Sequence, residues 1–276
     1  MEIILPSKKK KTIHPTVIFK EAWGICWKHL GKLSVIYLIF NLPVAVAYLT
    51  PMAKMGKEPN PSMFLWFFLP VLIISIWGHI ALLLSAKKAV DSEDYTIGQS
   101  ISQTKGFFLK YLGTVLVSAL FLMGIPILGS ISVAVILALL LKGNKILAVL
   151  VCLALAIAAF ASFVYFMLRW SFAPTVCVLE NTRPITALKR SFSLVKDYIH
   201  PVVGTYCLVT LIYIACLLPI IIAGGFLATG NNAEQFNRVY IIYSIFINIA
   251  LVPFCVTITV VLYKKLKEAL KANVYA

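Results

Sequence analysis

The stretch VVGTYCLVTLIYIACLLPIIIAGGFLA, which occupies residues 202–228, carries no charged side chain and decides the fold class. A helix rises about 1.5 Å per residue, so about 20 apolar residues cross the roughly 30 Å hydrocarbon core of a bilayer. The apolar run is continuous, whereas a transmembrane β-strand alternates apolar and polar residues over about ten positions. This stretch therefore predicts a membrane-spanning α-helix.

Five further stretches have the same character, and they occupy residues 33–49, 63–86, 111–141, 146–167 and 239–263. Hydrophobic residues make up 61% of the 276 positions and charged residues only 13%. This composition lies outside the range of water-soluble globular proteins. The sequence therefore predicts an all-α polytopic membrane bundle with six transmembrane helices, organised as a single membrane domain over residues 1–276.

Lys and Arg residues concentrate on alternate connections between the predicted spans. Most of the 25 lie before the first span, between the second and third, between the fourth and fifth, or after the sixth. The other connections hold Lys54, Lys57, Lys142, Lys145 and Arg238. Cytoplasmic loops carry the excess of Lys and Arg in membrane proteins. We therefore expect a multi-pass protein of the cytoplasmic membrane with both termini in the cytoplasm, and we attribute the net charge of +15 to topology and not to a nucleic-acid partner.

A short amphipathic segment precedes each odd-numbered span. Its apolar residues recur at helical spacing, and they are Phe19, Trp23, Trp27 and Leu30 in the first segment, Ile97, Ile101, Phe108 and Leu112 in the second, and Ile185, Leu188, Phe192, Val195 and Ile199 in the third. Each segment is too short and too charged to cross a bilayer, so we expect it at the membrane interface. A cytoplasmic helix packed on the bundle is the alternative.

The span that follows each amphipathic segment contains a proline, at Pro43, Pro126 and Pro219. A proline removes one backbone hydrogen bond and bends a helix. An interfacial helix, a kinked span and a second span therefore form a unit that recurs over residues 16–86, 96–170 and 184–264, after a basic tail at 1–15. Because each unit contains two spans, the units are parallel repeats, which predicts a pseudo-threefold arrangement.

No catalytic or metal-binding constellation is evident in the sequence. All ten Asp and Glu residues lie outside the predicted spans, and the four His residues belong to different segments. The six Cys residues are scattered without a CxxC pair, which favours packing roles. We therefore expect a non-enzymatic protein with no metal and no cofactor.

Three polar residues stand out within the predicted spans: Asn41, His79 and Asn248. Polar side chains inside a membrane are costly, so each is a candidate for function. Hydrogen bonds between helices are one role for Asn41 and His79, and a binding site is the other.

The densest polar cluster reads RWSFAPTVCVLENTRPITALKRSFSLVKDY over residues 169–198. Pro174 ends or breaks the preceding helix, and Pro184 suits the first turn of the next one. Glu180 lies near four cations in the sequence, Arg169, Arg183, Lys189 and Arg190. One carboxylate among several cations predicts a structural ion-paired elbow at the cytoplasmic surface, for which Arg169, Glu180 and Arg183 are the candidate residues.

The alternative for this cluster is an anionic lipid headgroup held by Arg183, Lys189 and Arg190, because basic clusters beside a membrane attract anionic headgroups. The run of Lys8, Lys9, Lys10 and Lys11 is a second candidate contact of this kind, although such a run is also typical of a solvated topology signal.

The residues from Glu180 onward resemble the signature of the six-span membrane module of glycerophosphoryl diester phosphodiesterases, in which a Glu precedes the pattern A-L-x-R-S-x-x-L-V-K. The matching stretch contains Glu180, Ala187, Leu188, Lys189, Arg190, Ser191, Leu194, Val195 and Lys196. The opening IFKEAWGICWKHLGKL is similar to the first interfacial helix of that family, which also includes standalone prokaryotic membrane proteins of largely uncharacterised function. Catalysis in its phosphodiesterases belongs to a separate soluble barrel, so the resemblance implies the membrane module alone.

These observations favour a lipid-interacting or scaffold module whose interfacial helices hold anionic headgroups, with no known protein partner. The alternative is a channel or transporter for a small solute, in which the kinked spans surround a path lined by Asn41, Ser118 and Ser130. A dry axis of Leu and Ile would favour the scaffold, and a continuous polar cavity would favour transport.

Overall fold

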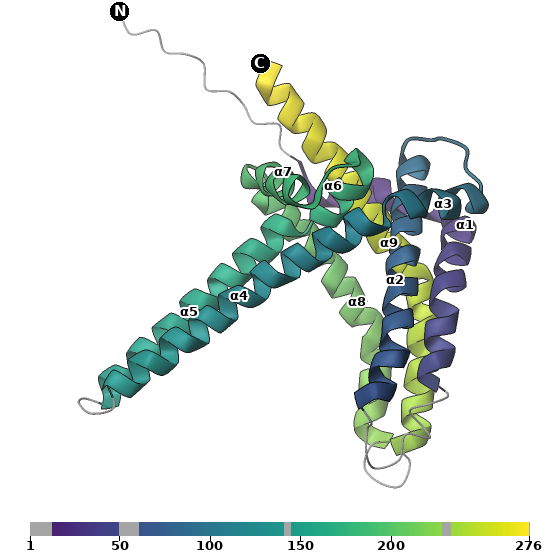
Figure 1. The fold of residues 1–276 in the computed structure, drawn as a ribbon. Coiled ribbons are helices and arrows are strands. Elements are labelled where there is room, and N and C mark those ends of the chain that lie inside the picture. Colours follow the sequence, from purple (N-terminus) through teal and green to yellow (C-terminus); the bar gives the residue numbers. More distant parts are fainter. Residues whose placement is uncertain (1–12, 50–60, 141–144, 228–232, 276) are drawn as a thin grey trace, which may run out of the picture. The chain divides into compact units, whose positions relative to one another are not determined.

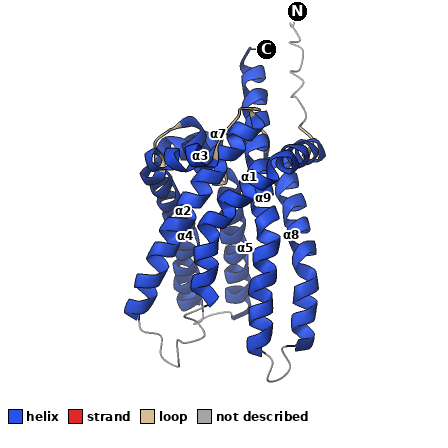
Figure 2. Cartoon of the chain, turned by 90° about the vertical axis from the view of Figure 1, so that its right-hand side faces the viewer, coloured by secondary structure: helices blue, strands red, loops and turns tan. Residues whose placement is uncertain are grey.

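The structure is a computed structural model that describes residues 13–49, 61–140, 145–227 and 233–275, and these residues form helices without any strand (Figure 2). The helices, shown in Figure 1, are α1 (Pro15–Leu49), α2 (Pro61–Val90), α3 (Ile97–Gln103), the 3₁₀ turn η1 (Thr104–Gly106), α4 (Phe108–Leu140), α5 (Lys145–Trp170), α6 (Ala173–Glu180), α7 (Pro184–Lys196), α8 (Ile199–Leu227) and α9 (Ala233–Tyr275).

Five segments are long and apolar enough to cross a membrane: Leu69–Val90, Phe108–Ala134, Val149–Glu180, Ile199–Ala223 and Val239–Ala272. They coincide with five of the six predicted spans, so the prediction of an all-helical membrane protein is confirmed for these segments. The first predicted span, 33–49, lies in α1, but the side chains of residues 44–49 fall outside the described residues. That span stays a prediction.

The amphipathic segments differ from one another in structure. α7 is a separate helix that ends at Lys196, before α8 begins at Ile199. α3 is short, is capped by Thr96 and passes into η1. The first segment is not separate at all, because α1 continues from Pro15 to Leu49 without a break.

Prolines also fail to distinguish the odd-numbered spans, since Pro70 lies inside α2 and Pro253 inside α9.

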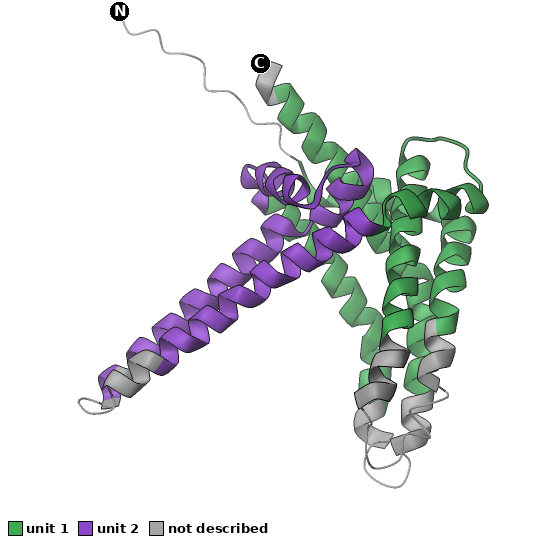
Figure 3. Ribbon diagram, in the orientation of Figure 1, with its two compact units in different colours: residues 1–108, 200–276 green, residues 109–199 purple. Residues whose placement is uncertain are grey.

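The helices group into two compact units, one of residues 1–108 with 200–276 and the other of residues 109–199 (Figure 3). These boundaries do not coincide with those of the predicted repeats, and the threefold arrangement stays a prediction.

The core of the first unit lies where α1, α2 and α9 pack on one another (Figure 1). From α1 the buried row is Ile18, Ala22, Cys26, Leu33, Ile36 and Phe40. Trp23 and Trp27 of the predicted apolar face are 50% and 66% exposed and do not belong to this buried row. Their predicted place at the membrane interface stays a prediction. α1 therefore has two apolar rows, one against its neighbouring helices and one facing outward.

A close approach of α1 and α2 depends on Gly78, which is buried. A Cβ atom at this position would lie 2.6 Å from the Cβ of Phe40. Carbon atoms in contact are about 3.5–4.0 Å apart, so only glycine fits here without displacing α1.

Ser34 supplies a backbone hydrogen bond that α9 cannot make for itself. Pro253 has no N–H group, so the carbonyl four residues earlier, that of Ile249, loses its helical donor. The Ser34 hydroxyl of α1 donates to this carbonyl at 3.0 Å. The interhelical bond thus repairs the interruption in α9 and joins α9 to α1.

Charged contacts gather at one end of this unit. Lys265 near the end of α9 pairs with Glu21 of α1 at 3.0 Å, and Lys264 pairs with Asp91 after α2 at 2.9 Å. The Lys32 ammonium donates to the carbonyl of Tyr95 at 3.2 Å. These contacts bring the first turns of α1, the end of α2 and the last turns of α9 to the same end of the unit.

We expect Gly78→Ala to lower the free energy of unfolding by about 1–3 kcal/mol, because the added methyl group overlaps Phe40. Gly24→Ala in α1 is the matched control, since nothing lies within 4 Å of a Cβ at that position. Alanine is the better helix former by up to about 1 kcal/mol, so this control is expected to gain stability. Thermal unfolding in detergent measures both, and equal midpoints for the two variants would contradict the proposed overlap.

We expect Ser34→Ala to cost about 0.6–1.7 kcal/mol, the range measured for hydrogen bonds between membrane helices. Ser75→Ala is the control, because the Ser75 hydroxyl donates only to the Val71 carbonyl of its own helix. Denaturant-induced unfolding of the two variants in mixed micelles compares these costs. A loss as large in Ser75→Ala would show that the bond to Ile249 has no special weight.

Candidate functional site

The polar elbow of the second unit, defined as residues 169–198, is built from the end of α5, α6 and α7. α5 ends at Trp170, and Pro174 occupies the first turn of α6, as predicted. α6 ends at Asn181, whose φ of 55° and ψ of 38° are left-handed, a conformation that asparagine tolerates. Arg183 is extended, and Pro184 begins α7 as predicted.

Arg169 is a buried cation of the elbow, with only 7% of its surface exposed. Its guanidinium carbon lies 4.8 Å from the ring centre of Tyr165 and 4.5 Å from that of Phe192. Nη1 donates to the Phe192 carbonyl at 3.3 Å, and Nε has no hydrogen-bond partner among the described residues. Two aromatic faces and one carbonyl therefore stabilise this charge.

Ser191 joins α7 to the end of α5. Its side chain is completely buried, and its hydroxyl donates to the Arg169 carbonyl at 2.7 Å. This carbonyl lies in the last turn of α5, where no helical donor follows. Ser191 therefore caps α5 from the neighbouring helix and fixes the position of α7 across it.

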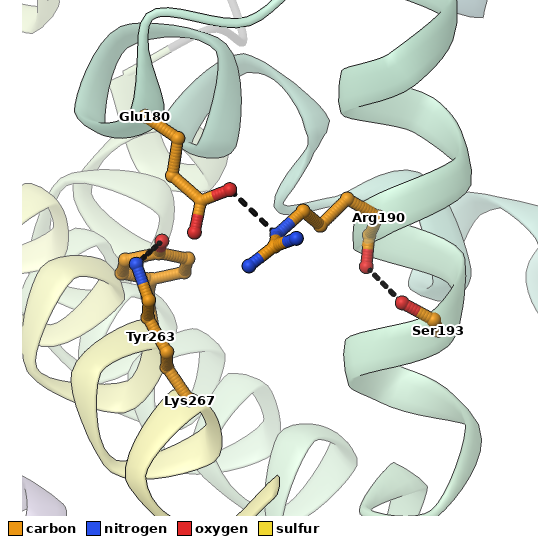
Figure 4. A network of polar contacts seen from close by, with 5 residues as sticks. All are labelled: Glu180, Arg190, Ser193, Tyr263 and Lys267. Carbon is orange, nitrogen blue, oxygen red and sulfur yellow. Dashed lines mark hydrogen bonds and ion pairs between the residues drawn. The ribbon is translucent and has the colours of Figure 1, made fainter. Parts of the chain in front are cut away.

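Glu180 forms its ion pair with Arg190, whose Nε lies 2.6 Å from the carboxylate (Figure 4). Arg190 is one of the four cations that the sequence places near Glu180, and it lies almost two turns into α7. Arg169, a candidate residue of the predicted elbow, has its side chain between two aromatic rings instead. The clamp exists, but it joins α6 to α7.

Two of the predicted headgroup contacts remain open to solvent or lipid. Arg183 and Lys189 are exposed, and neither forms an ion pair with a described carboxylate. Arg190 is half exposed and is held by Glu180. The other predicted contacts, Lys8, Lys9, Lys10 and Lys11, lie outside the described residues.

An apolar groove lies beside Lys189. It has a volume of about 380 Å³ and is lined by Val117 and Phe121 of α4, Trp170 of α5, and Ile185, Leu188, Lys189 and Phe192 of α7. The buried residues of α7 are Ala187, Leu188, Ser191, Leu194 and Val195, of which Leu188 and Val195 also belong to the predicted apolar face. Ile185 of that predicted face is 62% exposed at the rim of the groove.

Two of the three predicted intramembrane polar residues form hydrogen bonds within their own helices. Asn41 donates to the Tyr37 carbonyl at 3.0 Å and Asn248 to the Ser244 carbonyl at 2.8 Å, each within its own helix. A role of Asn41 between helices stays a prediction. His79 lies half-buried in α2. The hydroxyls of Ser118 and Ser130, proposed to line a path, likewise bond to their own helix.

Among the residues that the structure describes, no three His, Cys, Asp or Glu side chains gather to hold a metal ion.

Sequence reasoning missed the burial of Arg169 and the capping role of Ser191. A signal was present in both cases, because Tyr165 precedes Arg169 by one helical turn and Ser191 falls between the apolar residues Leu188 and Val195.

We expect Ser191→Ala to destabilise the second unit by about 1–3 kcal/mol, because it leaves a buried carbonyl without a donor. Ser193→Ala is a closely matched control on the same helix. The exposed Ser193 hydroxyl donates only to the Arg190 carbonyl, at 2.8 Å (Figure 4), and its loss should cost less than about 0.5 kcal/mol. Limited proteolysis between residues 171 and 183 measures how often this region opens in each variant. Equal cleavage rates for Ser191→Ala and Ser193→Ala would contradict the capping role of Ser191.

The comparisons with known proteins place the chain without assigning an activity. No curated protein and no solved structure matches it. A family model that carries no functional name matches residues 16–266, which includes both units and the polar elbow. The chain therefore belongs to the family described as Domain of unknown function (DUF7847).

Proposed function

We propose that this protein is a non-enzymatic, lipid-interacting module of the cytoplasmic membrane, and that the polar elbow binds the headgroups of anionic lipids. The observation that carries the proposal is the exposed cation Lys189, which lines an apolar groove, together with exposed Arg183 directly before the first residue of the same helix. Neither side chain forms an ion pair with a described carboxylate. An anionic lipid has a phosphate headgroup that can contact the cations and acyl chains that can contact the apolar groove.

The held position of α7 supports the proposal. Ser191 fixes the helix on α5, and Arg190 ties it to Glu180. The cations are therefore presented on a fixed helix, which reduces the entropy lost when a headgroup binds. The Arg guanidinium also forms paired hydrogen bonds with phosphate oxygens.

The composition of the elbow surface supports a membrane partner over a soluble anion. Ile185 is exposed beside Arg183, and the groove next to Lys189 is formed almost entirely by apolar side chains. An apolar surface of this kind is stable against acyl chains and costly against water. The resemblance to the membrane module of glycerophosphoryl diester phosphodiesterases rests on the same stretch and agrees with a role in the bilayer.

Spin-labelled phosphatidylglycerol and phosphatidylcholine, added to the protein in bilayers, test this proposal by electron paramagnetic resonance. We expect the immobilised fraction to be larger for phosphatidylglycerol, and Arg183→Gln with Lys189→Gln to lower its preference several-fold. Each cation near an anionic headgroup contributes about 1 kcal/mol. Added salt should also reduce the preference, because exposed charges are screened.

The double variant Lys87→Gln with Lys105→Gln is the control, because it removes the same charge from exposed positions outside the elbow. We expect it to keep most of the preference for phosphatidylglycerol. If the two double variants behave alike, the attraction is due to total charge and the elbow has no binding role.

A further inference from the structure

A second apolar groove lies in the first unit, between α1, α8 and α9, and has a volume of about 280 Å³. Trp23, Cys26 and Trp27 of α1 line it from one side, Ile212 and Cys216 of α8 from another, and Phe254 of α9 from the third. The lining segments of α8 and α9 belong to helices apolar enough to span a membrane. The groove is therefore bounded in part by segments that are apolar enough to lie in a membrane.

An aromatic ladder forms one wall of this groove. The rings of Phe19, Trp23 and Trp27 stack in sequence, with centroid separations of 6.2 and 5.7 Å. Phe254 meets Phe19 and Trp23 edge-on, at 5.3 Å in each case. These contacts hold flat apolar surfaces in fixed positions although both tryptophans are largely exposed.

Two cations lie along the helix beside the ladder. One face of α1 carries residues at steps of four, namely Lys20, Gly24 and Lys28. This face lies next to the row formed by Trp23 and Trp27. Both lysines are exposed and form no ion pair with a described carboxylate, whereas Glu21 is used by Lys265. The surface thus places positive charge beside a groove that is otherwise apolar.

The groove itself carries no charge. Burial raises the pKa of the Cys26 thiol to about 11, so this thiol is neutral at physiological pH. A volume of about 280 Å³ lies just below the roughly 300–1,000 Å³ of sites for small molecules. It suits part of one flexible chain and does not suit a polar headgroup.

We propose that this groove binds one acyl chain of an anionic bilayer lipid, whose headgroup contacts Lys20 and Lys28. The inference rests on the lipid-interacting function proposed above, but it concerns different residues on a different unit. The aromatic ladder shields the chain on one side, and the two lysines select the charge of the headgroup.

Tryptophan fluorescence tests the proposal directly, because Trp23 and Trp27 are themselves the wall of the groove. The other tryptophans are removed by Trp66→Phe, Trp77→Phe and Trp170→Phe, and the full chain is placed in phosphatidylcholine vesicles. A low mole fraction of lipid with brominated chains then acts as a contact quencher. We expect brominated phosphatidylglycerol to quench at least threefold more efficiently than brominated phosphatidylcholine.

Ala250→Phe, added to this variant, fills the groove from α9 and should reduce quenching by phosphatidylglycerol to the level of phosphatidylcholine. Ala215→Phe is the control, since Ala215 is exposed on α8 and does not line the groove. Should Ala250→Phe fail to fold, Lys20→Gln with Lys28→Gln gives an independent test and is expected to remove the difference between the two lipids.

Equal quenching by the two lipids before any groove substitution would overturn the proposal, as would an Ala250→Phe variant that is quenched like Ala215→Phe. Shielding of both tryptophans from both lipids would also overturn it, because the groove would then be covered by protein. The Arg183→Gln and Lys189→Gln variant should leave this quenching unchanged, so failure of the elbow and failure of the groove are separate results.

Discussion

The absence of water from the hydrocarbon core is the constraint on which the rest of this structure depends. Every backbone N–H and C=O group in that region needs a partner within the protein. Continuous helices meet this demand, and the described residues are helical almost throughout. The helices nevertheless contain prolines, each of which leaves one carbonyl without its donor. At Pro253 the hydroxyl of Ser34 provides the replacement, so a defect of one helix becomes a bond between two.

The same demand explains why polar side chains inside the helices contribute little to a site. Asn41, Asn248 and the hydroxyls of Ser118 and Ser130 donate to carbonyls of their own helices. Side chains that could line a polar path therefore have their donors occupied locally. The binding surfaces proposed here use exposed cations instead, in the elbow where α5, α6 and α7 end or begin, and on α1 beside the aromatic ladder.

Composition and periodicity were sufficient to predict the helical class and five of the spans, because length and hydropathy are local properties of the chain. The same was true of Pro174 and Pro184 at the starts of α6 and α7. Packing partners could not be predicted in this way. The buried row of α1 includes the small residues Ala22 and Cys26, which give a weak apolar signal among charged neighbours. The larger Trp23 and Trp27 give a stronger apolar signal but are exposed. Likewise, Glu180 meets Arg190 because the chain turns at Asn181, and the spacing of charges in the sequence does not contain that turn.

The enclosure of Arg169 has a consequence for how the second unit responds to its surroundings. The guanidinium group of Arg169 lies between the rings of Tyr165 and Phe192 and is largely buried. Mobile ions weaken the field of a covered charge much less than that of an exposed one. The second unit therefore keeps the electropositive contribution of Arg169 at ordinary ionic strength, whereas added salt weakens the contribution of its exposed lysines.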